Sequence, residues 1–477
     1  MTKQASFTMT RRQLIKGGGA LVVTFGLPNS LVSQTSGGPS TIKPPLSPDQ
    51  LDSYVRIGAD GKVTAFFGKM DMGQGVDTAI AQIVADELDV SFERVGVLMS
   101  DTAYTVNQGG ASGSTGIRSG AIPLRNAAAE ARRVLLDWAS GHLDVPADEL
   151  EVIDGIIQVK NDPSKSVSYE ELIGDRYFNV SLEWNQRMGN ALSAKGIADP
   201  KTPDQYKIVG QSIPRLDVPG KVLATTAFVT DVKVEGMVHG RVIRPPIAGA
   251  RPTGFNESSI SDIPGTQVVH IKDFIGVVAE EEWDAINAAR RLEVNWSEVD
   301  SPFCEMADLY DYIRRTPHVE ENAGRGFQGS IADTEAEVDK ALEGAAQVVE
   351  AEYEHPFQSH ASMGPACAVV DAKPDQATVW TGSQKSHMTR EGVSKLLELP
   401  IDKVRGIWVP GPGSYGRNDA GDGAMDAALL SRAVGKPVRV QGMRHEGHGW
   451  DPKGPASVIH IKAGLDADNK VIGYRFK

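Results

Sequence analysis

The sequence is poor in cysteine, in positive charge and in long apolar runs, and each shortage excludes a class of function. Its two cysteines, Cys304 and Cys367, are too few for an iron–sulfur cluster, which usually requires about four thiolates. They form no metal-ligand pattern with nearby histidines; a single disulfide is conceivable, but two isolated buried thiols are expected. Redox chemistry in this protein therefore requires a bound cofactor, with any cluster on another chain.

The charge balance is acidic, with a formal net charge of −13. Nucleic-acid-binding proteins carry basic patches that displace counterions from phosphates, so this balance argues against a nucleic-acid partner and is ordinary for solubility. Beyond the N-terminal segment, no apolar run approaches the roughly 20 residues of a membrane span. We expect no stable membrane span unless the N-terminal segment is retained as an anchor.

Glycine, in contrast, is abundant: 50 of the 477 residues are glycine. The usual share is roughly 7%. Excess glycine in a globular protein indicates many tight turns or backbone brought close to a ligand. The length predicts two or three domains.

Residues 1–34 have the features of an export signal. Thr10-Arg11-Arg12-Gln13-Leu14-Ile15-Lys16 has the twin-arginine pattern, and an apolar run follows at 17–27. This run is too short to span a membrane but suits the core of a signal, and its three consecutive glycines disfavour the alternative of a core helix. Because twin-arginine export carries folded proteins, it suits a cofactor inserted in the cytoplasm. We expect a periplasmic or cell-envelope protein.

Composition shifts divide the rest of the chain into segments. They are a Pro/Gly-rich linker at 35–50, a first structured segment at 51–212, an α+β unit at 213–300, a polar connecting segment at 301–345 and a final segment at 346–477. Alternation at 53–57 and 63–67 predicts a hairpin, and alternation over 222–242 predicts further strands. The expected fold class is α+β with several domains.

Three glycine-rich loops each precede a predicted helix. The loop at 68–75 precedes apolar residues at helical spacing, 107–116 precedes a helix that Pro123 begins, and 410–419 precedes a helix at 424–434 that Gly435 closes. A glycine-rich turn into a helix N-terminus directs unpaired backbone N–H groups toward an anion. Three such loops predict convergence on one polar, anionic ligand.

Glycine-rich loops also occur in other kinds of site. Each loop taken singly is compatible with an ordinary helix start. None has the Walker lysine at the right place, and none is a dinucleotide fingerprint. No G-x-S-x-G nucleophile elbow surrounds Ser112, Ser114 or Ser414, which excludes an α/β-hydrolase on its key motif.

Taken together, the motifs resemble the large subunits of molybdenum hydroxylases of the xanthine dehydrogenase/aldehyde oxidase superfamily, especially the isoquinoline 1-oxidoreductase type. Met72-Gly73-Gln74-Gly75 looks like the pterin loop, and Gly110-Ala111-Ser112-Gly113-Ser114 is similar to the loop around the cofactor phosphate and nucleotide. Trp380-Thr381-Gly382-Ser383-Gln384 looks like the segment whose glutamine faces the apical oxo group. Gly413-Ser414-Tyr415-Gly416-Arg417 resembles the loop over the metal, and 227–246 resembles part of the family's hammerhead domain.

The resemblance implies a large-subunit fold with an inserted α/β hammerhead domain at 213–300 and molybdopterin-binding segments at 51–212 and 346–477. It implies molybdopterin, in the cytosine dinucleotide form, with molybdenum that takes no protein ligand. The residues that it assigns to cofactor binding are Gly73, Gln74, Gly75, Ala111, Ser112, Ser114, Gln384, Gly413, Tyr415, Gly416 and Arg417.

The activity that the resemblance implies is hydroxylation of N-heteroaromatics or oxidation of aldehydes with water-derived oxygen. Electrons would leave through the pterin to a small subunit with 2Fe–2S clusters, and then to a cytochrome or another acceptor. The protein orients the reactants, while the cofactor supplies the chemistry.

The sequence departs from the family at its C-terminus. The family's catalytic glutamate base would lie beyond Lys477, and residues 471–477 read as the second strand of a hairpin, so we expect a C-terminally truncated or split product, inactive in isolation and without a catalytic residue of its own. Glu446 is not expected to replace that base. His355, His360 and His387 are expected to be structural or pocket-lining rather than metal ligands. The alternatives are a non-catalytic fragment of such a subunit, or an exported binding protein for a phosphorylated ligand.

Overall fold

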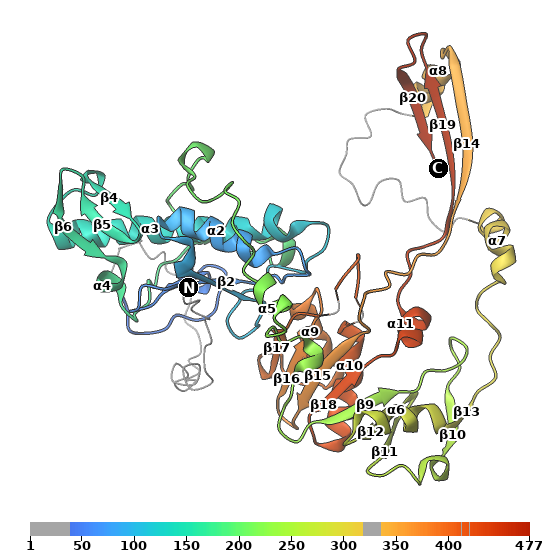
Figure 1. The fold of residues 1–477 in the computed structure, drawn as a ribbon. Helices are drawn as coiled ribbons and strands as arrows, with labels where there is room; N and C mark the ends of the chain where they lie inside the picture. The colour runs from blue at the N-terminus through green and yellow to red at the C-terminus, as the bar shows by residue number, and fades with distance from the viewer. Residues whose placement is uncertain (1–38, 318–334, 412, 419) are drawn as a thin grey trace. The chain divides into compact units, whose positions relative to one another are not determined.

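The computed structural model describes residues 39–317, 335–411, 413–418 and 420–477 (Figure 1). The twin-arginine motif lies outside these ranges, so the export signal remains a prediction. The segments at 35–50 and 301–345 also lie partly outside them.

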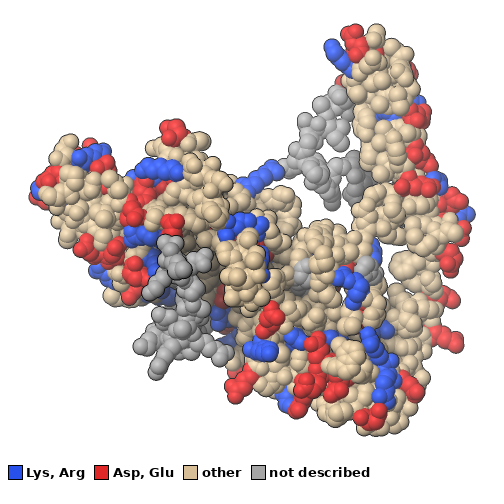
Figure 2. Space-filling model, in the orientation of Figure 1, with Lys and Arg blue, Asp and Glu red and all other residues tan. Residues whose placement is uncertain are grey.

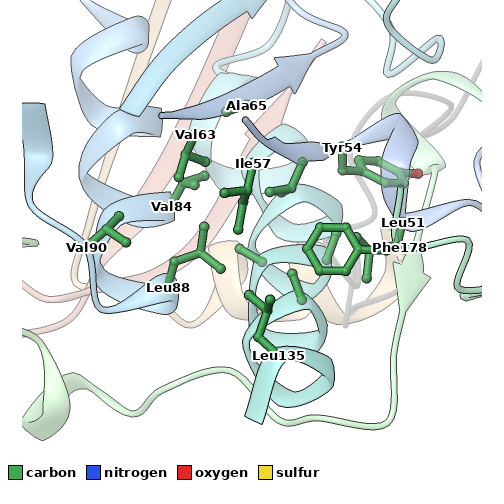
Figure 3. Close-up of a cluster of buried hydrophobic side chains, with 14 of the residues drawn as sticks. Leu51, Tyr54, Ile57, Val63, Ala65, Val84, Leu88, Val90, Leu135 and Phe178 are labelled. Atoms are coloured by element: carbon green, nitrogen blue, oxygen red, sulfur yellow. The ribbon is translucent and has the colours of Figure 1, made fainter. Parts of the chain in front are cut away.

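The first part of the chain is a small sheet covered by two helices. Its strands are β1 (Val55–Ile57), β2 (Val63–Phe67) and β3 (Val95–Met99), and its helices are α2 (Val76–Leu88) and α3 (Ala121–Leu143). β1 and β2 are antiparallel, which confirms the predicted hairpin, whereas β2 and β3 are parallel. Figure 3 shows the buried core between them, where Ile57, Leu88 and Leu135 lie among other fully buried side chains.

Smaller sheets complete this part. Three antiparallel strands follow α3, namely β4 (Leu150–Ile153), β5 (Ile156–Val159) and β6 (Asp162–Ser168). They lead into α4 (Tyr169–Ile173). A capping box between Ser168 and Glu171, in which each side chain bonds the backbone N–H of the other residue, caps the start of this helix. A two-stranded ribbon of β7 (Glu183–Trp184) and β8 (Ala194–Lys195) comes next.

A seven-stranded sheet forms the centre of the second part. Its order is β11 (Gln267–Ile271), β12 (Phe274–Ala279), β9 (Val238–Val242), β18 (Val438–Gln441), β15 (Cys367–Ala372), β16 (Ala377–Thr381) and β17 (Val404–Trp408). Strands from the predicted segments 213–300 and 346–477 therefore share one sheet, joined by the parallel pair β9 and β18. The bounds between these segments remain predictions.

Three longer helices pack against this sheet. They are α6 (Glu282–Arg291), α9 (Ser386–Leu396) and α10 (Ala420–Val434). The helix predicted at 282–291 is confirmed. The helix predicted at 424–434 begins earlier, at Ala420, and ends as predicted before Gly435, whose φ is +67°. Two further strands, β10 (Pro252–Asn256) and β13 (Glu293–Trp296), pair with each other outside this sheet.

The strands predicted over 222–242 are wrong for most of that stretch. Val222 ends the short helix α5 (Val218–Val222), and only β9 at the far end is a strand. Between them the Asp231 carboxylate accepts a hydrogen bond from the Phe228 N–H at 2.9 Å, which holds a tight turn. A local side-chain bond of this kind competes with strand pairing, and alternation of residue types does not reveal it.

A separate three-stranded sheet ends the chain. β14 (Gln347–His355), β19 (Ser457–Leu465) and β20 (Val471–Phe476) are antiparallel, and β20 is the second strand of a hairpin, as predicted for residues 471–477. The helix α8 (Glu335–Glu343) packs on β19 and β20, while α7 (Leu309–Arg315) contacts β19 (Figure 1). Acidic and basic side chains are interspersed on the face that Figure 2 shows. No helix among the described residues is long and apolar enough to cross a membrane.

Candidate functional site

Four loops follow the carboxyl ends of two parallel strand pairs. Residues 68–75 follow β2 and 100–115 follow β3, while 382–385 follow β16 and 409–419 follow β17. Neighbouring parallel strands end at the same edge of a sheet, so the loops of each pair lie together. In open α/β sheets that edge is the usual place for a ligand. Each of these loops leads into a helix or its first turn.

Hydrogen bonds join the two strand pairs directly. The Thr102 N–H donates to the Gly406 carbonyl at 2.9 Å, and the Gly406 N–H donates to the Thr102 hydroxyl at 2.9 Å. The segment after β3 thereby extends the edge of the seven-stranded sheet beside β17. As a result, loops from distant parts of the sequence lie against one another.

Gln384 is the point where three of the predicted segments meet. Its side chain is buried, with the residue 5% exposed. The Nε2 atom donates to the Gly416 carbonyl at 3.1 Å, and Oε1 accepts a hydrogen bond from the Ser414 hydroxyl. These partners fix the orientation of the carboxamide and leave its second N–H without an acceptor among the described residues.

The second glycine loop contacts Gln384 through its backbone. The Ala111 N–H donates to the Gln384 carbonyl at 2.9 Å. A Cβ atom at Gly110 would lie 2.8 Å from that same carbonyl oxygen and 2.7 Å from Cγ of Lys385. Glycine at this position is therefore required by the close approach of two backbones.

The first glycine loop contacts the second through Lys69, and Gln74 lies nearby. The Lys69 ammonium donates to the Gly110 carbonyl at 2.9 Å. Nε2 of the exposed Gln74 lies 4.0 Å from the position of a Cβ on Gly116. The guanidinium of Arg215 donates to the Gly73 carbonyl at 3.0 Å and holds this loop from its other side.

The remaining predicted residues flank these contacts. Gly75 (φ +75°) and Gly413 (φ +95°) have left-handed backbones, as does Ser114 (φ +56°). Tyr415 is 59% exposed, and Arg417 forms an ion pair at 3.6 Å with Asp422 in the first turn of α10. Ser112 is partly buried, and its carbonyl accepts the Thr115 hydroxyl at 2.6 Å. The structure thus brings the predicted segments together, while their roles in binding remain predictions.

The candidate histidines and Glu446 lie at different places. His387 is buried at the start of α9, and burial, with a smaller contribution from Arg390, lowers its pKa to about 4. His360 lies beside Gly416, with Cε1 3.0 Å from the position of a Cβ there. The Glu446 carboxylate accepts the Met443 N–H and caps the helix α11 (Arg444–Trp450), which is a structural use of this acid. Of the side chains described, none form a group of three or more His, Cys, Asp or Glu residues able to hold a metal ion.

A cavity of about 310 Å³ lies beside the first turns of α10. It lies between α10, α11 and the carboxyl ends of β9 and β18, and its polar wall includes Arg244, Asp426 and Glu446. Arg244 pairs with Asp426, whose pKa burial raises to about 6. Asp422, which lines the cavity, pairs with Arg417 of the loop that contacts Gln384.

Comparison with known proteins decides the family. Residues 3–235 and 320–477 match two sequence models, each described as a molybdopterin cofactor-binding domain. A nicotinate dehydrogenase subunit from Pseudomonas putida is 38% identical over 445 residues. The chain belongs to the xanthine dehydrogenase family of molybdopterin-binding proteins. The predicted family and the implied molybdopterin cofactor with molybdenum are confirmed at this level.

The relatives are longer than this chain. The alignment with the nicotinate dehydrogenase protein covers 91% of this chain and 36% of the relative. The beta subunit of isoquinoline 1-oxidoreductase from Brevundimonas diminuta is 26% identical, over 98% of this chain and 63% of the relative. Among solved structures, quinoline 2-oxidoreductase from Pseudomonas putida 86 is similar with a TM-score of 0.46 and 18% identity, over 57% of this chain and 39% of that one.

Several residues of this site carry no signal in the sequence. Lys69 lies within the loop at 68–75, but nothing in the sequence indicates that it is fully buried. Asn190 and Arg215 reach the site from segments without a motif. Gln108 is 1% exposed and joins the Gly68 N–H to the Gly120 carbonyl. The sequence signal nearest to these contacts is the presence of polar side chains, such as Gln108, within or beside the glycine-rich loops.

Proposed function

We propose that this chain is the molybdopterin-binding part of an oxidoreductase that hydroxylates an N-heteroaromatic ring or oxidises an aldehyde. The oxygen comes from water, and the electrons pass to a small iron–sulfur subunit. The meeting of the three glycine-rich loops carries this proposal: the second and third loops contact Gln384, and the first contacts the second through Lys69. The names of the relatives, a nicotinate dehydrogenase and an isoquinoline oxidoreductase, support N-heteroaromatics as the substrate class.

The groups at the converged loops suit a polar, anionic pterin. The described residues provide no acceptor for the N–H groups of Tyr415 and Gly416. The buried amide of Asn418 donates to the carbonyls of Gly382 and Gly413, but its Oδ1 atom has no partner among the described residues. The site therefore offers two N–H donors and one buried acceptor that the described residues leave without partners. A ligand rich in hydrogen-bonding groups would supply those partners.

When bound, the molybdenum cofactor supplies the two-electron redox chemistry and the oxygen transfer. The protein contributes binding and orientation. The free N–H of Gln384 is available to an oxygen acceptor, and the backbone N–H groups of Tyr415 and Gly416 add two further donors. Gln74, Ser112 and Ser114 contribute polar side chains from the first two loops. Donors that are already fixed lose little conformational entropy when the ligand binds.

Co-production with an iron–sulfur subunit tests this proposal. The purified complex is assayed for dye reduction with N-heteroaromatic and aldehyde substrates, beside the variants Gln384→Ala and Gln376→Ala. Gln376 is exposed at the turn before β16 and serves as the matched control. Turnover that is lost in Gln384→Ala and kept in Gln376→Ala supports the proposal. A complex with full molybdenum that reduces dye with neither substrate class contradicts it.

Export is a further part of the proposal. The twin-arginine motif at 10–16 supports delivery of the loaded, folded protein to the periplasm or cell envelope. Replacing Arg11 and Arg12 with lysine should leave the protein in the cytoplasm, as fractionation of the cells would show. Unchanged delivery would contradict this part alone.

A further inference from the structure

Lys69 is a buried cation beneath the second glycine loop. Its residue is 0% exposed, and its Nζ atom donates to three neutral oxygens. They are the carbonyl of Gly110 at 2.9 Å, the hydroxyl of Thr115 at 3.2 Å and the amide oxygen of Asn190 at 2.6 Å. Within the described ranges no carboxylate pairs with it. The three donors of the ammonium are thus satisfied while its charge is not neutralised.

The Gly110–Ala111 peptide joins this ammonium to Gln384. The carbonyl of the peptide accepts from Lys69, and its N–H donates to the Gln384 carbonyl at 2.9 Å. Both bonds are on one planar group, so the cation polarises the peptide and strengthens the second bond. The position of Gln384 therefore depends on Lys69 through a single peptide.

The stem of Lys69 is held as closely as its charged end. A Cβ atom on Gly120 would lie 2.4 Å from Cδ of Lys69, so a side chain at this position, just before α3, would collide with the lysine stem. Gln108 fixes the backbone on both sides of this stem. Its amide donates to the Gly120 carbonyl at 3.0 Å and accepts a hydrogen bond from the Gly68 N–H. The ammonium is therefore confined to one position under residues 110–115.

An unneutralised buried cation is costly in the free protein, and an anion bound nearby would offset that cost. We propose that Lys69 is a positioning residue of the cofactor site, which holds the Gly110–Ala111 peptide against Gln384 and provides positive charge beneath the loop for a phosphoryl group. The inference rests on the proposed function, because it assigns the loop at 107–116 to the cofactor phosphate. Lys69 acts through the loop, since it is fully buried.

Two substitutions separate anchoring from charge. Lys69→Met removes both the hydrogen bonds and the cation at similar volume. Asn190→Asp keeps the bond to Nζ but places a carboxylate against it, so the anchor remains while the net charge is cancelled. Lys395→Met, on the exposed side of α9, is the matched control for loss of a lysine.

The full-length purified chain is titrated with inorganic pyrophosphate, and the thermal unfolding midpoint reports binding. Hydrogen exchange of peptides covering 107–116 reports anchoring. We expect pyrophosphate affinity to fall on the order of tenfold in both Lys69→Met and Asn190→Asp. Exchange should accelerate in Lys69→Met alone, and Lys395→Met should match the wild type. Because burial lowers the pKa of Lys69 to about 8, wild-type affinity should also decline above that pH, and Asn190→Asp should lack this decline.

A wild-type chain that pyrophosphate does not stabilise would overturn the inference. Wild-type affinity in Asn190→Asp, or wild-type exchange in a folded Lys69→Met, would do the same. If Lys69→Met does not fold, the affinity of Asn190→Asp still decides the role of the charge. None of these measurements requires molybdenum, so they fail or succeed separately from the proposed function.

Discussion

Arg405 and Asp101 form an ion pair with two contacts, in which Nε lies 3.0 Å and Nη2 lies 2.6 Å from the carboxylate oxygens. Asp101 is buried beside β3, whereas Arg405 is on β17 and its side chain is 36% exposed. The pair, together with the Thr102 and Gly406 bonds, joins the two strand pairs whose loops form the candidate site. The hydrogen bond to Asp101 raises the pKa of Arg405, so the arginine stays charged at every pH at which the protein is folded.

Replacing Arg405 with methionine should weaken this junction. The substitution leaves the Asp101 carboxylate buried without its cation, and the free energy of unfolding should fall by about 1–3 kcal/mol after allowance for solvent at Arg405. Urea unfolding measures the change. Arg251→Met is the control, because its ion pair with Asp273 is 3.6 Å long and exposed on both sides. Equal losses in the two variants would show that the junction does not depend on this pair.

Gly110→Ala should destabilise the protein, since its Cβ would lie 2.7 Å from Lys385 Cγ and 2.8 Å from the Gln384 carbonyl oxygen. Overpacking of this kind costs about 1–3 kcal/mol. Gly141→Ala is the matched control in α3, where a Cβ meets nothing within 4 Å and alanine should stabilise the helix by about 0.5–1 kcal/mol. Thermal unfolding of both variants checks the opposite signs. Stabilisation by Gly110→Ala would contradict the close contact between these loops.

Ser414→Ala tests how the Gln384 carboxamide is oriented. Its hydroxyl donates to Oε1 and so directs Nε2 toward Gly416. Without it the amide is free to rotate, and dye-reduction turnover in the complex should fall on the order of tenfold, while molybdenum content stays near the wild-type value. Ser261→Ala, on an exposed turn, is the control. Unchanged turnover in Ser414→Ala would mean that the amide orientation does not affect the reaction.

His387 should make stability fall in mild acid. Burial lowers its pKa to about 4 from an unfolded value of 6.5, so between these values the unfolded chain binds more protons. Its contribution is complete above pH 6.5 and is lost as the pH falls toward 4, with about 2 kcal/mol lost by pH 5. His387→Gln should remove this part of the pH dependence, whereas exposed His142→Gln should not. Parallel stability curves for wild type and His387→Gln would contradict the shift.

The sequence predicts the local elements of this fold well, because periodicity and turn residues act over short distances. The hairpin at 53–67, the helix after Gly75 and the helix at 282–291 all follow from such patterns. The shared seven-stranded sheet does not, since pairing between β9 and β18 joins residues far apart in the chain. The strands predicted from alternation over 222–242 are mostly wrong, because the hydrogen bond between the Phe228 N–H and the Asp231 carboxylate favours a turn there.

The candidate site was predictable as a set of loops but not as a set of contacts. Glycine-rich turns before helices identified residues 68–75, 107–116 and 410–419, and the family resemblance added Gln384. The contacts that join them involve backbone carbonyls of Gly110 and Gly416, which any residue provides, and the buried Lys69. Burial of a lysine runs against its usual exposure, so residue type alone points the wrong way.

Molybdenum content, measured for protein purified from cells that make molybdopterin, tests whether the three glycine-rich loops hold one cofactor. We expect about one molybdenum atom and one pterin per chain in the wild type. We expect much lower molybdenum content in Gly110→Ala and in Gly411→Ala. A Cβ atom at residue 411 would lie 2.7 Å from the Gly382 Cα. A wild-type chain that contains neither molybdenum nor pterin would contradict convergence of the loops on one cofactor. Full molybdenum content in folded Gly110→Ala and Gly411→Ala would contradict it as well.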